Sequence, residues 1–242
     1  MIKGLYTSVA GLQAAENRQQ ALAASLANAN TPGYKSDDVT TESFEKIFNA
    51  LFTTPGMPGT GALTSGDKLD MTQGALQQTG APLDLALDGD GFFVLDGPNG
   101  QLYTRSGRFM RDAGGTLRSP DGNAVEGVDG QPITATGVNV QVGPDGTVLS
   151  DNVPVGRIKL VTLDPTTLTR AGTATFTTSG QPGAANAKVI SGALESSNVD
   201  VSSVMTAMTL LLRAFEAGNS AIQLQNQTLN ATVNQVGATP GA

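Results

Sequence analysis

The chain contains no cysteine, no histidine and no tryptophan among its 242 residues. Without thiolate or imidazole ligands it cannot build the usual structural zinc site, and without histidine it cannot form a Ser-His-Asp triad or a Cys-His pair. The lack of cysteine also excludes disulfide bonds and leaves the redox compartment open. We therefore expect no catalytic residues, no metal site and no cofactor, and we expect the chain not to be an enzyme.

Charged residues are scarce as well, at 14% of the chain, so the surface must rely on serine, threonine, asparagine, glutamine and glycine. The formal net charge is −7. A protein that binds nucleic acid needs a basic patch that neutralises phosphates, and the densest basic group is only Arg105, Arg108 and Arg111. Nucleic acid is therefore not an expected partner.

Long hydrophobic runs are also missing. No apolar stretch approaches the roughly 18 residues that a membrane-spanning helix needs. The N-terminal sequence MIKGLYTSVAGLQAAENRQQ is interrupted by polar residues, so it lacks the continuous apolar region of a secretory signal peptide. We expect a protein that is not inserted in a membrane and that, if it leaves the cytoplasm, does so without a cleaved leader of this type.

Both ends of the chain carry regular hydrophobic periodicity. Apolar residues recur at spacings of three, four and seven near the N-terminus, and every seven residues from Val201 to Val236. Sustained heptads indicate coiled-coil packing. We expect a helix and exit turn over residues 1–35 and a helix within 191–242, paired with each other. The predicted assembly seam is Leu5, Leu12, Leu26, Val201, Val204, Met208, Leu211, Phe215, Ile222, Leu229 and Val236.

The C-terminal helix should begin near ESSNVDVSS, with Asn198 as its N-cap and Asp200 in its first turn. No charged residue follows Glu216, so the face opposite the seam is uncharged. One interpretation is a polar low-complexity tail. We favour a helix that is buried among other helices or that lines a wet channel.

The stretch SLANANTPGYK, residues 25–35, should end the first helix. Asn28 and Asn30 tolerate the left-handed conformation that closes helices, and Pro32-Gly33 suits the centre of a type II turn. A connector rich in glycine, proline, serine and threonine is expected over 36–75. Between the two helices, short apolar segments alternate with Asp-Gly and Asn-Gly turns. They predict a compact all-β sandwich or barrel over 76–190, so that the fold class is α+β.

Three motifs in this order resemble the bacterial flagellar axial proteins of the rod and hook family, and together they span nearly the whole chain. The first is SLANANTPGYK, the second is PLDLALDGDGFFVL followed by YTRSGRF, and the third is GALESSNVDVSSVMTAM with RAFEAGNSAI. The matching positions include Asn28, Asn30, Thr31, Gly33, Leu83, Asp84, Gly89, Gly91, Phe92, Phe93, Arg105, Gly107, Glu195 and Asn198.

The resemblance implies a structural subunit of the flagellar basal-body rod, of the proximal-rod type rather than the distal-rod type. Family members are exported through the type III apparatus without a cleaved signal. They polymerise helically, with themselves and with other rod and hook subunits, into a hollow shaft that crosses the periplasm, transmits torque and encloses the export channel. A hook-type axial protein and a secreted β-domain that binds a ligand from a coiled-coil stalk are the alternatives.

Overall fold

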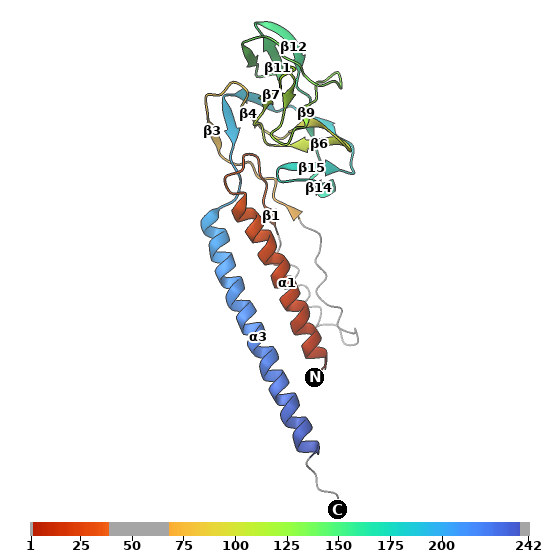
Figure 1. The fold of residues 1–242 in the computed structure, drawn as a ribbon, viewed down its shortest axis with the longest axis vertical. Coiled ribbons are helices and arrows are strands. Elements are labelled where there is room, and N and C mark those ends of the chain that lie inside the picture. The colour runs from red at the N-terminus through yellow and green to blue at the C-terminus, as the bar shows by residue number, and fades with distance from the viewer. Residues whose placement is uncertain (1, 39–67, 238–242) are drawn as a thin grey trace, which may run out of the picture. The chain divides into compact units, whose positions relative to one another are not determined.

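The computed structural model describes residues 2–38 and 68–237, and its contacts divide the chain into two compact units (Figure 1). The first unit contains the two long helices, and the second unit contains residues 27–36 and 69–199. The central part of the predicted connector lies outside the described residues. The α+β class predicted from the sequence is confirmed, with a β-rich region between an N-terminal and a C-terminal helix.

Helix α1 spans Ile2–Ala27 and helix α3 spans Val201–Gly237. At about 1.5 Å per residue, the 37 residues of α3 extend roughly 55 Å. Neither of these two helices carries an apolar window long enough to cross a membrane.

The start of α3 differs from the prediction. Asp200 is the N-cap, because its Oδ1 accepts a hydrogen bond from Ser202 N at 3.0 Å, and its carbonyl accepts one from Val204 N at 3.0 Å. The prediction that Asn198 caps this helix is wrong. The side chain of Asn198 instead bonds to backbone and side-chain groups of the β-rich unit.

The β-rich unit is larger than the predicted 76–190. Strand β17 pairs with β4 and β18 pairs with β3, all antiparallel, which extends the unit toward Val199. The strands are β3 (Leu76–Gln78), β4 (Leu85–Asp88), β5 (Phe92–Gly97), β6 (Gly100–Thr104), β7 (Met110–Arg111), β8 (Leu117–Arg118), β9 (Ala124–Val125), β10 (Val140–Val142), β11 (Thr147–Ser150), β12 (Val153–Arg157), β13 (Leu160–Thr162), β14 (Leu168–Arg170), β15 (Thr175–Thr178), β16 (Gly183–Ala184), β17 (Lys188–Ser191) and β18 (Ala193–Glu195).

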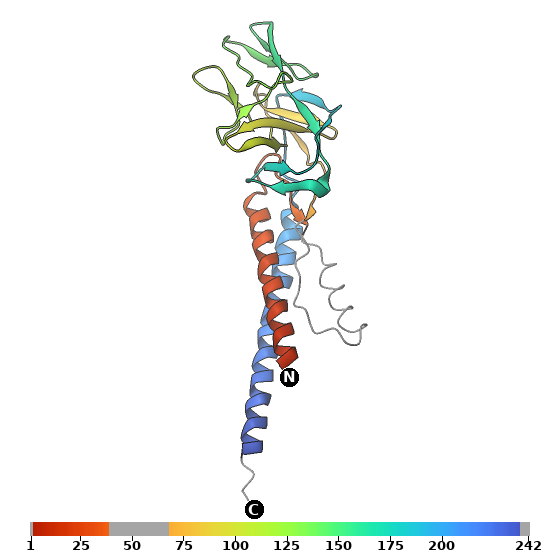
Figure 2. The same cartoon turned by 90° about the vertical axis from the view of Figure 1, so that its right-hand side faces the viewer.

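The largest sheet has the order β14-β15-β6-β5-β9-β8-β7, and β13 pairs with both β5 and β16 (Figure 2). Strands β10, β11 and β12 form a separate three-stranded sheet, which is not hydrogen-bonded to the largest sheet through any of these strands. The short strands β1 (Asp37–Asp38) and β2 (Lys68–Leu69) form a two-stranded sheet, and the 3-10 helix η1 (Pro165–Thr167) precedes β14.

The sequence predicted a turn at Asn99-Gly100, and a hairpin does join β5 and β6 there, but its two loop residues are Pro98 and Asn99. Gly97 pairs with Gly100, whose φ of +119° lies in a region that residues with a Cβ rarely adopt. The hairpin places the FFVL run of β5 at the centre of the largest sheet.

Strand β5 is buried on both faces, which explains why its sequence is continuously apolar instead of alternating. Phe93 and Leu95 belong to one hydrophobic cluster, and Phe92 and Val94 belong to another. Phe93 packs edge-on against Phe109, with ring centroids 5.2 Å apart, and Phe92 packs in the same way against Phe176 at 6.1 Å.

Candidate functional site

The exit turn after α1 folds as part of the β-rich unit. Thr31 N donates to the Asn28 carbonyl at 3.0 Å, and the Thr31 hydroxyl donates to Asn28 Oδ1 at 3.2 Å. Tyr34 N then donates to the Thr31 carbonyl at 3.2 Å, and Gly33 has a φ of +68°. A bond from the fourth to the first residue, with a positive φ at the third, is what the predicted type II turn requires. Asn30 is exposed.

Position 33 requires glycine for two reasons, its positive φ and the close approach of the backbone at Ser106. A Cβ at this position would lie 2.3 Å from Ser106 N, and Gly33 N donates to the Glu195 carbonyl at 2.8 Å. The turn therefore touches the segment after β6 and strand β18 at once. We call this meeting point of residues 27–36, 69–74, 105–107 and 193–198 the junction.

Three buried charged side chains lie at the centre of the junction. Lys35 Nζ is 2.6 Å from Glu195 Oε1, and Arg105 Nε is 3.0 Å from Glu195 Oε2. The side chains of Lys35, Arg105 and Glu195 are 1%, 5% and 0% exposed. Lys35 and Glu195 are 160 positions apart in the sequence. This ion triad joins the segment that follows α1 to the segment that precedes α3.

Backbone groups add hydrogen bonds to the triad, whereas Glu195 Oε2 has only its ion pair with Arg105 and no hydrogen bond. Lys35 Nζ donates to the Thr72 carbonyl at 2.6 Å, Arg105 Nη1 donates to the Gly91 carbonyl at 2.5 Å, and Gly74 N donates to Glu195 Oε1 at 3.1 Å. Burial lowers the pKa of Lys35 below its ordinary value of 10.5, and the hydrogen bond to Glu195 opposes this change. Removing one partner of such a buried set is costly, because it leaves a charge uncompensated.

Asn198 makes a second cross-link at the junction. Its Oδ1 accepts from Ser36 N at 2.8 Å, and its Nδ2 donates to the Asp70 carbonyl at 2.9 Å and to Thr72 Oγ1 at 3.3 Å. An amide carries both acceptor and donors, so a single side chain can bridge two backbone segments in this way.

Arg170 in β14 holds the same turn from the other side. Its Nη2 donates to the Lys35 carbonyl at 2.5 Å, and its guanidinium carbon lies 4.8 Å from the centroid of the Tyr34 ring and 5.5 Å from that of Phe176. These distances fall within the range of cation–π attraction. Tyr34 is thereby held against the largest sheet.

The remaining motif residues lie in strand β5 and in the turns and connections around it. Asp84 contributes its carbonyl, which accepts from Gly192 N at 2.8 Å, and Leu83 packs against the first hydrophobic cluster. A Cβ on Gly107 would lie 1.6 Å from the Leu85 carbonyl oxygen, so the backbones touch there. Gly89 and Gly91 precede β5, which carries Phe92 and Phe93.

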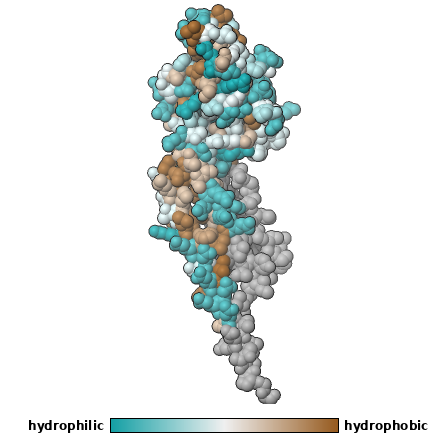
Figure 3. Space-filling model, in the orientation of Figure 1, coloured by the Kyte–Doolittle hydropathy of each residue, from teal (hydrophilic) through white to brown (hydrophobic). Residues whose placement is uncertain are grey.

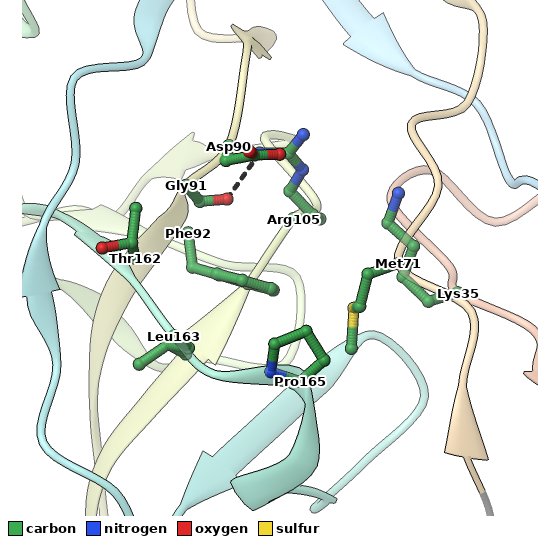
Figure 4. Close-up of a pocket in the computed structure, with 9 residues that line it drawn as sticks. All are labelled: Lys35, Met71, Asp90, Gly91, Phe92, Arg105, Thr162, Leu163 and Pro165. Carbon is green, nitrogen blue, oxygen red and sulfur yellow. Dashed lines mark hydrogen bonds between the residues drawn. The ribbon is translucent and has the colours of Figure 1, made fainter.

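A cavity of about 270 Å³ opens beside the junction (Figure 4). Met71, Phe92, Leu163 and Pro165 give it apolar walls, and Lys35, Asp90, Gly91, Arg105 and Thr162 complete its lining. Lys35 and Arg105 are paired with Glu195, so the charge that the lining presents to the cavity is the exposed carboxylate of Asp90 beside the apolar walls.

The predicted seam residues lie on the two helices of the first unit. Side chains of Val204, Met208, Leu211, Phe215 and Ile222 are half-buried, whereas Val201 is 39% exposed. Leu12 and Leu26 are half-buried on α1, and a Cβ on Gly218 would lie 3.1 Å from Leu12 Cδ2. Leu5 lies in α1, and Leu229 and Val236 lie in α3. The seam as a set stays a prediction.

Sequence reasoning missed most of the junction. Lys35 is the last residue of the first sequence motif, and no sequence pattern points to Tyr34, Thr72, Gly74 or Arg170. A lysine followed by a glutamate 160 positions later gives no local signal of an ion pair. Pro32-Gly33 did give a local signal for the exit turn, whereas Asn28 and Asn30 do not adopt the left-handed conformation expected of them, because Gly33 supplies the positive φ of this turn.

Among the residues that the structure describes, the most elaborate arrangement of polar side chains is a closed, buried junction between chain segments. Such an arrangement fixes the backbone segments that it joins. Together with the two long helices, it defines a structural subunit of the helix–β–helix type.

Comparisons with known protein families agree with this class. Three family models match the chain: "Flagella basal body rod protein" at residues 5–35, "Flagellar hook protein FlgE/F/G D1 domain" at 86–150, and "Flagellar basal body rod FlgEFG protein C-terminal" at 190–236. The first covers most of α1 and the exit turn, the second covers much of the β-rich unit, and the third covers the end of β17, β18 and most of α3.

Similar proteins match over almost the whole chain. The flagellar basal-body rod protein FlgF of Mesorhizobium japonicum is 31% identical over 96% of this chain and 95% of its own length. FlgG of Bacillus subtilis is 30% identical over 97% and 99%, and FlgF of Escherichia coli is 31% identical over 89% and 91%. The hook protein FlgE of Brucella abortus matches only 55% of this chain and 34% of its own length, which favours the rod over the hook.

The chain belongs to the flagellar basal-body rod protein family. It is a structural, non-enzymatic subunit of the rod, located in the flagellar basal body, and the similarities support the proximal-rod type. Other axial subunits of the flagellum are its partners in assembly.

Proposed function

We propose that this subunit polymerises helically, that its terminal helices pair as a coiled coil, and that the resulting hollow shaft transmits torque and surrounds an export channel. The observation that carries the proposal is the pattern along α3. Val204, Met208, Leu211, Phe215 and Ile222 follow heptad spacing and are less exposed than Met205, Leu210 and Leu224 on the same helix. Leu12 of α1 approaches the same side of α3 at Gly218.

A narrow apolar seam favours assembly over stability of the single chain. A heptad seam buries a thin stripe, so the remaining helix surface needs neighbours. Contacts between unlike surfaces of successive subunits do not close and therefore propagate a helix. We infer that copies of this chain and other axial subunits supply those neighbours. We also infer that the chain reaches the rod through the type III export apparatus without a cleaved signal.

The junction suits a part that transmits torque. Within the β-rich unit, residues 28–36 follow α1 and residues 195–199 precede α3, and the ion triad and Asn198 join these two segments. Because both connections are held at one buried place, a load on either segment is passed to the sheet and not absorbed by a flexible linker.

The seam is tested by Phe215→Asp, which places a charge on the predicted stripe. We expect loss of swimming and basal bodies that lack an intact rod, while Phe215→Leu and the exposed control Ser203→Asp keep both. Electron microscopy of isolated basal bodies is the measurement. Normal rods in the Phe215→Asp strain would refute the seam as the assembly surface.

A further inference from the structure

An exposed aliphatic patch lies on the β-rich unit. Val128, Val138, Val153 and Val155 are 61%, 85%, 61% and 40% exposed. Two hydrogen bonds hold residues 128 and 138 beside β12 and the turn before it: Val128 N donates to the Arg157 carbonyl at 2.9 Å, and Val138 N donates to the side-chain Oδ2 of Asp151 at 3.1 Å. We call these four residues the valine patch.

The valine patch is not needed for the core of its own sheet. Val140, Val142 and Val148 of β10 and β11 already supply the buried side chains. Figure 3 shows hydrophobic surface at the end of the β-rich unit that carries β11 and β12. Single exposed apolar residues are ordinary, but a group of them marks a contact surface.

The cavity beside the junction is a complementary surface. Its volume of about 270 Å³ lies below the roughly 300–1,000 Å³ of small-molecule pockets, and suits one or two aliphatic side chains. Figure 4 shows Met71, Phe92, Leu163 and Pro165 around the open space. Glu195 already pairs with both lining cations, and the exposed Asp90 stays in contact with solvent, so an apolar side chain can occupy the wall of Phe92 and Leu163 without burying an unpaired cation.

The two surfaces lie at opposite ends of the β-rich unit. In Figures 1 and 2, β11 and β12 occupy one end, and β14, which directly follows the cavity residue Pro165 and η1, lies toward the other. Two unlike surfaces on one subunit make an open contact, in which the front of one copy meets the back of the next.

We propose that the valine patch of one copy docks into the cavity of a neighbouring copy of this chain. This inference rests on the proposed helical polymerisation. It assigns a front-to-back contact to the β-rich units of successive copies in addition to the seam between helices, with Val138 as the most exposed side chain of the patch and the wall of Phe92 and Leu163 as its receptor.

The lack of native cysteine makes a cross-linking test specific. The double variant Val138→Cys with Thr162→Cys would be treated, in cells with assembled flagella, with a short-armed bis-maleimide and resolved on denaturing gels. We expect multimers of the chain in the double variant and none in either single variant. Leu76→Cys paired with Thr162→Cys is the control, because Leu76 is exposed but lies outside the patch.

Rod assembly is scored separately by electron microscopy of the same strains. Assembled rods that give no multimers, or that cross-link only to a different protein, would overturn the docking while leaving polymerisation intact. If the unmodified chain formed no rod, the proposed function itself would fail.

A second variant tests the same contact without cysteine. Val138→Asp should reduce swimming at least severalfold while the circular dichroism of the purified chain is unchanged, because Val138 makes no contribution to the core. Met110→Asp, at a 50% exposed methionine outside the patch, should leave swimming unaltered. Equal swimming of the two variants would count against the proposal.

Discussion

At the residue scale, the junction explains why particular residue types occur where they do. Gly33 combines a left-handed backbone with the closest backbone approach in the exit turn, and Glu195 is the single acid between two buried bases. The turn could be predicted because Pro32-Gly33 imposes it locally. The ion triad could not, since its members come together only after the strands have paired.

Gly33→Ala should destabilise the β-rich unit far more than Gly80→Ala. Both glycines have a positive φ, +68° and +74°, so both variants carry the left-handed cost of about 1–2 kcal/mol. Only Gly33 adds a clash with Ser106 N, whereas a Cβ on Gly80 would meet nothing within 4 Å. Urea unfolding monitored by circular dichroism measures the difference, and equal losses would contradict the close approach.

Glu195→Gln keeps the shape of the side chain and removes the charge that Lys35 and Arg105 share. We expect a loss of about 3–5 kcal/mol in the free energy of unfolding, because two cations then remain buried without an anion. Asp112→Asn is the matched control, since Asp112 pairs with Arg118 at 2.7 Å on the surface. Thermal unfolding should separate the two variants clearly. A Glu195→Gln protein as stable as Asp112→Asn would mean that the triad does not hold the junction.

At the element scale, the helices and the tight hairpins were predictable, and the long-range strand pairs were not. Heptad spacing identified α3, and Asn99-Gly100 identified the β5–β6 hairpin. Strand β18 pairs with β3 across more than a hundred residues, which a local pattern cannot encode. The N-cap was displaced by two residues because Asn198 and Asp200 both suit a cap, and only the tertiary bonds of Asn198 decide between them.

Asp200→Ala should weaken the start of α3 by about 1 kcal/mol, since the Ser202 amide loses its acceptor. Asp200→Asn should keep the cap, because asparagine accepts the same bond nearly as well. The helical signal in circular dichroism during urea titration is the readout for both variants. Identical curves for the alanine and asparagine variants would show that this cap is not formed.

At the scale of the whole molecule, the uncharged polar surface of α3 suits the wall of the proposed export channel, through which unfolded chains would move. The last charged residue is Glu216, and Gln223, Gln227 and Asn230 are exposed. A fixed charge on such a wall would hold oppositely charged segments in place. The sequence alone suggested this lining, because it needs only composition and helical spacing.

Three lysines at Gln223, Gln227 and Asn230 should slow the export of acidic flagellar substrates. The control variant carries Gln223→Asn, Gln227→Asn and Asn230→Gln, which add no charge. Secretion rate and filament length are the measurements. Unchanged motility and filament growth in the lysine variant would remove this face of α3 from the channel wall.

The central claim is that the chain is an axial structural subunit whose C-terminal helix is required for assembly. A strain lacking the gene would be complemented with the full chain or with a chain that lacks residues 200–242, and scored by swimming and by electron microscopy of isolated basal bodies. The account predicts a normal rod with the full chain, and loss of the rod beyond its base both without the gene and with the truncated chain. Intact, rotating flagella in the deletion strain would contradict it.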